Sequence, residues 1–365
     1  MTGQLMTILD RYLIKQFVQT IVFGLAAFTL IFVVIDMMEN LDDFIDQNIN
    51  FFTIVKYYLY FIPEIIRLIT PVAVLFAGLF TTGKMANLNE ITAIKSGGVS
   101  MYRFMAPIVI VTFFISLLSV YFGGYIVPQA NKWKLEIEVN QLKKGMTFAG
   151  SNFFFQDAPN RIINISYFDN NNSSALRVSI QEYSANNLTK MSRRIDAGRL
   201  NFDSLSGSWI ALDGTDRIFK DTTESFEYFT SKKLPEINFR PDDLEFKQKK
   251  PEQMNLSELN RLINDQIKAG MDPKSMIIDY HSRFAFALAS LVSILFGLPI
   301  SANKRKSGLA LQFGINILIT FIYLGLMKIF EAFGKNGAMH PILTAYIVNI
   351  VFFIAAVFNI SRIKQ

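Results

Sequence analysis

The sequence predicts an α+β membrane protein, in which six transmembrane helices form two groups of three around an inserted β-sandwich or jellyroll-like domain. Of its 365 residues, 51% are hydrophobic, and they gather in runs of the length, about 20 residues, that a helix needs to cross a bilayer. Between the third and fourth runs the pattern changes to short alternating segments and polar turns. Buried helices of a soluble core are the alternative, but such helices are seldom this long without a charge.

Six segments carry the apolar runs, and we expect each to span the membrane. They are residues 17–35, 65–80, 104–127, 284–300, 309–330 and 342–360. The second run is short, but apolar sequence reaches back from it to Phe51, interrupted by Lys56, Glu64 and Arg67. The first run is longer than the apolar core of a signal peptide and lacks a small-x-small cleavage site before the acidic segment 36–46, so we expect it to stay as an anchor.

Lys and Arg gather in alternate connections between these spans, which predicts the orientation because cytoplasmic loops are enriched in both residues. The basic residues on this side are Arg11, Lys15, Lys84, Lys95, Arg103, Lys304, Arg305, Lys306, Arg362 and Lys364. The connection after the first span is acidic instead, with Glu39, Asp42, Asp43 and Asp46. We therefore expect both termini in the cytoplasm and residues 128–275 on the far side. The net charge of +6 follows this topology and does not indicate nucleic-acid binding.

The far-side segment is expected to hold short strands at 161–168, 177–183, 208–212, 217–219 and 225–229, with a loop at 169–174 and a turn at Asp213-Gly214. Apolar spacing after Pro251 predicts an amphipathic helix over 255–269, packed on its own domain or docked to a partner. The predicted domains are residues 1–135 with three spans, 136–250 with the β domain, 251–275 with the connecting helix and 276–365 with three spans.

Residues 78–85 read G-x-x-x-x-G-K-M, one residue short of a phosphate-binding P-loop. Met85 cannot hold a magnesium ion as the Ser or Thr of that motif does, and the segment lies inside an apolar helical run instead of between a strand and a helix. We therefore expect that this chain does not hydrolyse ATP.

Catalytic motifs are scarce elsewhere in the sequence. It has two histidines, His281 and His340, at predicted membrane boundaries, and it has no cysteine and neither H-E-x-x-H nor G-x-S-x-G. The sequence therefore predicts neither an enzyme nor a metal site.

Ionisable residues near the outer membrane boundary are candidates for contact with a ligand. Glu64 with Arg67 and Lys328 with Glu331 form i,i+3 pairs of opposite sign, for which a structural role and a ligand-binding role are both open. Basic residues just beyond the third span could attract phosphate groups or could be a solvated helix face. They are Lys132, Lys134, Lys143 and Lys144.

The loop between the second and third spans predicts a short amphipathic helix. Met85, Leu88, Ile91 and Ile94 recur at every third residue, and Gly97-Gly98 ends the segment. Asn87 or Asn89 can cap this helix, with Glu90 in its first turn, where the helix dipole favours an acid. Such a helix could lie on the lipid surface or insert into a soluble partner.

Several motifs in one order resemble the LptF/LptG family of lipopolysaccharide-export permeases. They are L-D-R-Y at residues 9–12, T-P-V-A-V-L-F-A-G-L-F at 70–80, N-E-I-T-A-I-K-S-G-G-V-S at 89–100, G-L-P-I-S at 297–301 and K-N-G-A-M-H-P at 335–341. The L-D-R-Y motif is more similar to the G-type paralogue, whereas Thr82–Lys84 and K-N-G are more similar to the F type. The balance slightly favours the G type.

The resemblance implies an inner-membrane heterodimer of two such permeases on a cytoplasmic ABC ATPase dimer that uses the ATP, with no cofactor bound by this chain. It also implies a periplasmic β-jellyroll that passes lipopolysaccharide to bridge proteins of similar fold. The loop helix would be the coupling helix that enters the ATPase groove. The residues that match it are Leu88, Glu90, Ile91, Ile94, Lys95 and Gly97.

One departure concerns the outer end of the first span, where enterobacterial relatives carry lysines and this chain has Asp36, Asp42 and Asp43. The lipid could then carry fewer phosphates, be bridged by divalent cations or be held by other basic groups. The candidate substrate-binding residues are Asp36, Arg67, Lys132, Lys134 and Lys328. The alternative function is a non-transport scaffold or envelope sensor whose β domain binds a ligand.

Overall fold

The computed structural model describes residues 7–142, 151–169, 172–184, 187–204, 206–220, 223–241, 243–244, 249–268, 270–302 and 309–362. These residues form two compact units. The helical unit comprises Met1–Leu142, Pro251–Asn264 and Asp272–Gln365, and the β unit comprises Lys143–Lys250 and Asp265–Met271. Several basic residues used in the orientation and phosphate predictions lie outside the described ranges, namely Lys143, Lys144, Lys304, Arg305, Lys306 and Lys364.

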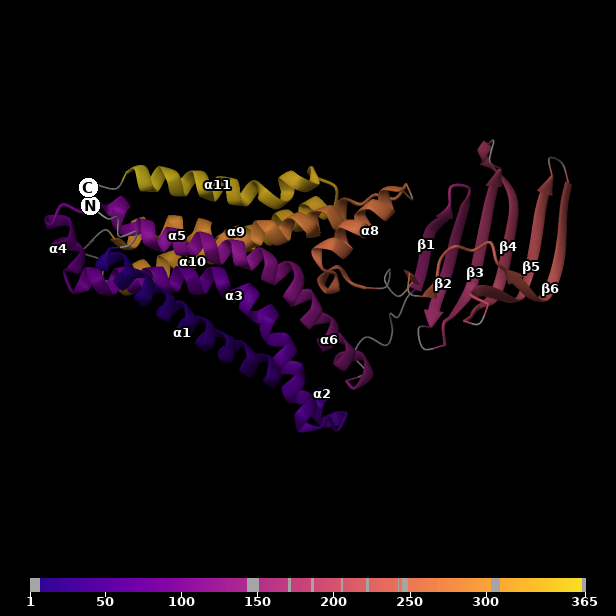
Figure 1. Ribbon diagram of the computed structural model, residues 1–365, viewed down its shortest axis with the longest axis horizontal. Coiled ribbons are helices and arrows are strands. Elements are labelled where there is room, and N and C mark those ends of the chain that lie inside the picture. The colour runs from indigo at the N-terminus through magenta and orange to yellow at the C-terminus, as the bar shows by residue number, and fades with distance from the viewer. Residues whose placement is uncertain are drawn as a thin grey trace. The chain divides into compact units, whose positions relative to one another are not determined.

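The helical unit confirms the predicted six spans, because six of its described helices are long and apolar enough to cross a membrane. They are α1 (Ile8–Glu39), α3 (Phe51–Asn87), α5 (Met101–Tyr121) continued by the π-helix η1 (Phe122–Ile126) and α6 (Val127–Asn140), α9 (Lys274–Ala302), α10 (Leu309–Lys335) and α11 (Pro341–Ser361). Shorter helices connect them, namely α2 (Leu41–Asp46), α4 (Glu90–Ser96), the 3₁₀-helix η2 (Pro251–Gln253) and α8 (Leu256–Lys268). Helix α1 begins and α11 ends at the end of the unit where α4 lies (Figure 1).

Helix α3 is longer than the apolar run that predicted it. It begins at Phe51, where the Asn50 side chain accepts a hydrogen bond from the Phe52 backbone N–H, and it continues through Pro63 and Pro71. Charged residues in its first half do not interrupt it, since an ion pair along the helix surface neutralises two of them, Glu64 and Arg67.

Helices α3 and α9 meet along a closely packed seam. A Cβ atom on Gly78 would lie 2.2 Å from Cδ1 of Ile294, and a Cβ atom on Gly297 would lie 2.3 Å from Cδ1 of Leu75. Each helix therefore presents a glycine to a large side chain of the other. The motifs at residues 70–80 and 297–301, which are part of the family resemblance, thus pack against one another. This contact joins the first three spans to the last three.

The β unit is a six-stranded antiparallel sheet, and with the six helices it confirms the predicted fold class. Its strands follow one another in the order β1 (Ser151–Ala158), β2 (Arg161–Asp169), β3 (Ser174–Ser184), β4 (Asn187–Asp203), β5 (Ser208–Lys220) and β6 (Thr223–Leu234). Apolar side chains from all six strands form one core, in which the Trp209 indole is buried and donates to the Phe239 carbonyl at 2.9 Å.

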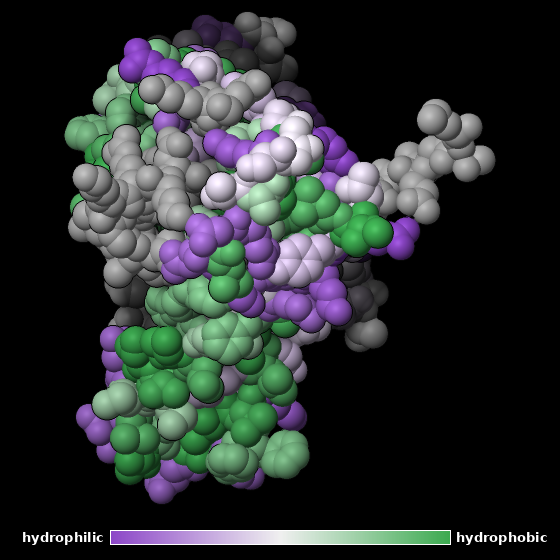
Figure 2. All heavy atoms as spheres, turned by 90° about the vertical axis from the view of Figure 1, so that its left-hand side faces the viewer, coloured by the Kyte–Doolittle hydropathy of each residue, from purple (hydrophilic) through white to green (hydrophobic). Residues whose placement is uncertain are grey.

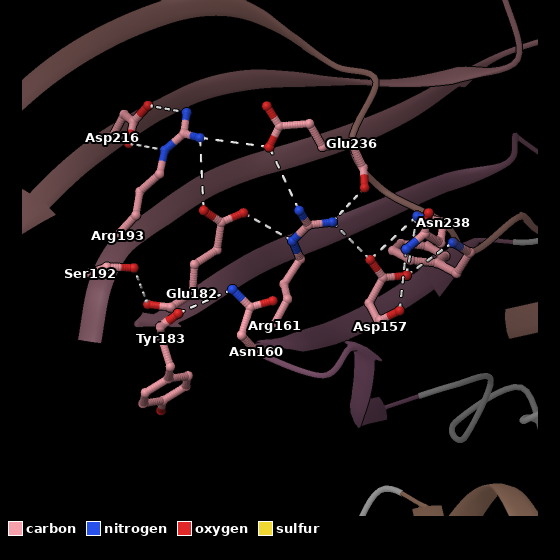
Figure 3. A network of polar contacts seen from close by, with 11 residues as sticks. Asp157, Asn160, Arg161, Glu182, Tyr183, Ser192, Arg193, Asp216, Glu236 and Asn238 are labelled. Atoms are coloured by element: carbon pink, nitrogen blue, oxygen red, sulfur yellow. Dashed lines mark hydrogen bonds and ion pairs between the residues drawn. The ribbon is translucent and has the colours of Figure 1, made fainter. Parts of the chain in front are cut away.

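A network of charged side chains joins neighbouring strands of this sheet (Figure 3). Arg161 of β2 donates to Glu182 of β3 at 2.9 Å, and Arg193 of β4 donates to Asp216 of β5 at 3.0 and 2.8 Å. Arg193 also lies 3.9 Å from Glu182, so the two ion pairs are continuous across four strands.

The predicted strands are parts of the longer strands β2, β3, β5 and β6, whereas β1 and β4 were not predicted. The turn predicted at Asp213-Gly214 is wrong. Both residues lie inside β5, where Asp213 has a positive φ of 49°. A Cβ atom at position 214 would lie 2.4 Å from the Asp196 carbonyl oxygen and 2.6 Å from the Phe229 ring. The neighbouring strands β4 and β6 approach β5 so closely here that only a glycine fits. The Asp-Gly sequence therefore marks an irregular point within a strand and not a turn.

The amphipathic helix predicted near residues 255–269 is confirmed as α8. Asn255 and Glu258 cap its start by exchanging backbone-to-side-chain hydrogen bonds, both of 2.9 Å. Three apolar residues of the helix are buried in the chain itself, namely Leu256, Leu259 and Ile263.

Candidate functional site

The P-loop-like segment at residues 78–85 is part of helix α3. Gly78 is buried within the helix, and the Thr82 hydroxyl donates to its carbonyl oxygen at 2.7 Å. Met85, at the position where a P-loop carries the magnesium-binding hydroxyl, is buried in the apolar core. A continuous helix cannot wrap its backbone N–H groups around a phosphate, so the geometry agrees with the expectation that this segment does not bind ATP.

The predicted loop helix is present as α4, and Gly97 and Gly98 follow it as expected. Asn89 occupies its N-cap position with φ 59°, but its side chain makes no capping hydrogen bond. Ile91 is only 5% exposed and lies in the core that α1, α3, α5 and α9 share, whereas Leu88 is 59% exposed. The apolar surface open to a partner is therefore narrower than the ridge of Leu88, Ile91 and Ile94 that the spacing suggests.

Charged and polar groups surround the exposed part of α4. Glu90 is half-buried and accepts a hydrogen bond from the Tyr12 hydroxyl at 3.4 Å, and Lys95 is half-buried in the last turn. Seen from this end of the helical unit, hydrophilic and hydrophobic residues occupy separate areas of the surface (Figure 2). The loop thus combines one exposed leucine with charged neighbours, which suits contact with a folded protein more than insertion into lipid.

A second candidate site is a charged cavity in the same unit, near the ends of α9 and α10 that lie away from α4 (Figure 1). Its volume is about 140 Å³, and α3, α6, η1, η2, α9, α10 and α11 contribute to its lining. The ionisable residues that line it are Glu64, Arg67, Glu252, Asp279, Arg283, Lys328, Glu331 and Lys335. Four cations and four carboxylates therefore surround one small space.

Most of these charges are paired across short distances. The two pairs expected from the sequence are confirmed as ion pairs, with Arg67 Nε 3.1 Å from Glu64 and Lys328 Nζ 2.8 Å from Glu331. Lys335 forms an ion pair of 3.0 Å with Glu331 on its own helix and joins α10 to α9 through an ion pair of 2.5 Å with Asp279.

Arg283 is the exception among these cations. Its Nη2 donates to the Pro251 carbonyl at 2.6 Å, while its buried Nη1 has no hydrogen-bond partner within the described part of the chain. A buried guanidinium nitrogen without an acceptor costs free energy, so this position favours a ligand that supplies one.

Sequence reasoning missed Arg283, Asp279 and Lys335. The available signal was that Arg283 directly precedes the apolar run starting at residue 284, where an ionisable residue is expensive. Its proximity to Arg67, however, depends on the packing of α9 against α3, which no local pattern gives.

Three of the sequence candidates do not line the cavity. Lys134 forms an ion pair with Glu138 at 3.3 Å and lies 3.9 Å above the Phe61 ring. Lys132 is half-buried on the same helix, and Asp36 is half-buried on α1. Within the described ranges, no three His, Asp or Glu residues lie close enough together to hold a metal ion.

The comparisons with known proteins agree with these features. A family model described as "Lipopolysaccharide export system permease LptF/LptG" matches residues 11–362, almost the whole chain. No curated protein matches the sequence.

Proposed function

Because the chain belongs to the LptF/LptG family of lipopolysaccharide export permeases, we propose that it is the membrane subunit through which an ABC transporter extracts lipopolysaccharide from the bacterial inner membrane. Members of this family are multi-pass transport proteins without a catalytic domain. In the proposed assembly a dimeric cytoplasmic ATPase hydrolyses ATP, and a paralogous permease completes the membrane part. The β unit would pass lipid to periplasmic bridge proteins of similar fold, and both termini would be cytoplasmic.

The observation that carries this proposal is helix α4, a polar loop helix held against the core that α1, α3, α5 and α9 share. Ile91 fixes it to the core of the chain, while Leu88 and Glu90 remain available to a partner. We propose that Leu88 enters a groove of the ATPase and that Glu90 meets a basic or polar group at its edge. Ile94, Lys95 and Gly97 would complete the contact.

The cavity is the proposed contact for the phosphorylated headgroup. Arg67 and Lys328 come from the two halves of the chain and line the same space, to which Arg283 adds a guanidinium nitrogen that has no hydrogen-bond partner among the described residues. Planar guanidinium groups suit phosphate because they donate two parallel hydrogen bonds. We assign Lys132 and Lys134 to a secondary contact outside the cavity, for which Lys134 would have to leave Glu138, and Asp36 would contribute there only through a bridging divalent cation.

We infer that the chain is the G-type paralogue. The L-D-R-Y sequence at residues 9–12 favours the G type. The partner permease would then be of the F type.

Glu90→Lys tests the coupling role, with Lys84→Ala as the matched control. Lys84 is exposed in the last turn of α3, and its removal would abolish a true P-loop. We expect Glu90→Lys to leave the chain inserted and folded, because the proposed site lies outside the bilayer and an α-helix tolerates Lys. It should nevertheless reduce the amount of ATPase that copurifies by about tenfold or more, since a charge reversal at an interface leaves its partner unpaired. Lys84→Ala should copurify normally.

The opposite order, with Lys84 essential and Glu90 dispensable, would refute the proposed coupling role. If the wild-type chain copurifies with no ATPase, the scaffold or sensor alternative is favoured instead.

A further inference from the structure

The first turn of α1 carries the L-D-R-Y sequence, and its side chains contact α4 and the start of α5, the helix that follows it. Asp10 is 5% exposed and exchanges hydrogen bonds with Thr7 in a capping box that starts the helix. The same carboxylate oxygen, Oδ2, accepts a hydrogen bond of 2.6 Å from Arg103 Nη2. Arg103 lies in the first turn of α5, which follows the loop. The ion pair therefore connects the start of α1 to the start of α5 over 93 residues of sequence.

A second contact reaches helix α4 itself. The Tyr12 hydroxyl donates to Glu90 Oε2 at 3.4 Å, in the first turn of α4. Leu13 is buried in the apolar cluster that also contains Ile91 of α4 and Met101 of α5. One helical turn of α1 thus contacts α4 and α5 through polar and apolar side chains.

Helix α4 needs such support because it is short and because two glycines connect it to α5. It has seven residues, fewer than an isolated helix needs to persist in water. Gly97 and Gly98 follow it. Gly98 has a φ of 80°, and no atom lies within 4 Å of the place that a Cβ atom would occupy. Without contacts from elsewhere, a displacement of α4 would be absorbed at these glycines and would not reach α5.

We propose that Asp10 and Tyr12 are positioning residues that make α1, α4 and the start of α5 move as one body, so that a displacement of α4 reaches the membrane helices. This inference rests on the proposed role of α4 as the contact for the ATPase. Asp10 acts through Arg103, because a charge-assisted hydrogen bond to a buried carboxylate is the strongest polar contact in this group. Tyr12 acts through Glu90 and ties the first turn of α4 to the first turns of α1.

The test uses the full complex with its ATPase, reconstituted in proteoliposomes loaded with lipopolysaccharide. Three quantities are measured, namely the ATPase that copurifies, the rate of ATP hydrolysis and the lipid released per ATP hydrolysed. The variants are Arg103→Ala and Tyr12→Phe, which leave the Thr7–Asp10 capping box intact. Arg11→Ala is the matched control, because Arg11 is an exposed cation in the same helical turn.

We expect both variants to keep the ATPase bound and active while the lipid released per ATP falls about fivefold, as loss of coupling between two sites produces. Arg103→Lys, which keeps the charge, should retain most of the coupling, and Arg11→Ala should behave as wild type. Asp10→Asn combined with Arg103→Ala should be no worse than Arg103→Ala alone, since both remove the same contact.

A covalent link separates positioning from a general loss of stability. The chain has no cysteine, so Asp10→Cys with Arg103→Cys creates a single pair of thiols. Joining them with a short bismaleimide should restore the lipid released per ATP, whereas the unlinked double variant should remain uncoupled.

Unchanged lipid release per ATP in Arg103→Ala and Tyr12→Phe would overturn the inference, and so would a linker that restores nothing. If these variants lose the ATPase altogether, Asp10 and Tyr12 belong to the docking surface, which also overturns the inference. Failure of the proposed function has a different signature, because the wild-type chain would then bind no ATPase at all.

Discussion

The seam between α3 and α9 gives a sharp prediction about how the two halves of the chain are joined. The change is Gly78→Ala, which adds one methyl group where Ile294 already fills the space. The new Cβ would lie 2.2 Å from Ile294 Cδ1, far inside van der Waals contact. Either the isoleucine must change its rotamer or the two helices must separate.

The expected cost follows from two opposing effects. Overpacking a filled site typically costs about 1–3 kcal/mol. Replacing glycine by alanine within a helix contributes about 1 kcal/mol in the opposite direction. Gly325→Ala in α10 isolates the second effect, because nothing lies within 4 Å of a Cβ atom at that position. Gly78→Ala should therefore be less stable than Gly325→Ala by about 1–3 kcal/mol.

A compensating substitution tests the cause. Ile294→Val removes Cδ1, the atom that the new methyl group would meet, and on its own it should cost about 0.5–1.5 kcal/mol. The double variant Gly78→Ala/Ile294→Val should lose less stability than the sum of the two single losses, by about 1 kcal/mol or more.

The assay is unfolding by SDS titration in mixed micelles, followed by circular dichroism, for the wild type and all four variants. The reasoning is refuted if Gly78→Ala and Gly325→Ala are equally stable. It is also refuted if the costs of Gly78→Ala and Ile294→Val simply add.

Two further predictions concern the β unit and the cavity. Hydrogen bonds from Arg193 and then Lys232 hold the pKa of the Asp216 carboxyl below its usual value, against the opposing effect of burial. This stabilisation should be complete above the usual Asp pKa of about 3.9 and be lost as the pH falls through the lowered folded-state value. Denaturant titrations followed by Trp209 fluorescence in a Trp133→Phe background should show that loss, and a matching Asp216→Asn variant should lack that part of the pH dependence. In the cavity, Arg283→Ala should reduce photo-crosslinking to lipopolysaccharide by about tenfold, the scale of a hydrogen bond to a charged group. Lys132→Ala should reduce it less, and equal losses would argue against the cavity as the main contact.

The fold was predictable because the signals that set it are local. Runs of apolar residues fix the six spans, and alternation with polar turns fixes the β unit. Local signals failed where a glycine had two explanations. Asp213-Gly214 has the sequence of a turn but lies within a strand, because the approach of a neighbouring strand, and not a change of chain direction, requires the glycine.

The candidate sites were predictable only in part, because local sequence signals do not show which residues of different helices come together. The pairs Glu64–Arg67 and Lys328–Glu331 are separated by three residues on one helix, so their spacing alone predicts the contact. Arg283 has its cavity neighbours on other helices. The periodicity of α4 identified an apolar ridge but could not show that Ile91 belongs to the core of this chain.

Helix α3 connects the two candidate sites through a single element. It contributes Arg67 to the cavity and Gly78 to the seam, and it ends at Asn87, directly before the α4 loop. Pro71 cannot donate a helical hydrogen bond to the Arg67 carbonyl, so the backbone ladder is weakest beside the cavity. Between Pro71 and Asn87 the helix has no such break, and its buried face packs on α9 and α1. A segment without such a break therefore runs from the α4 loop to Pro71, about one helical turn from Arg67, and the Gly78 variants test the middle of that segment.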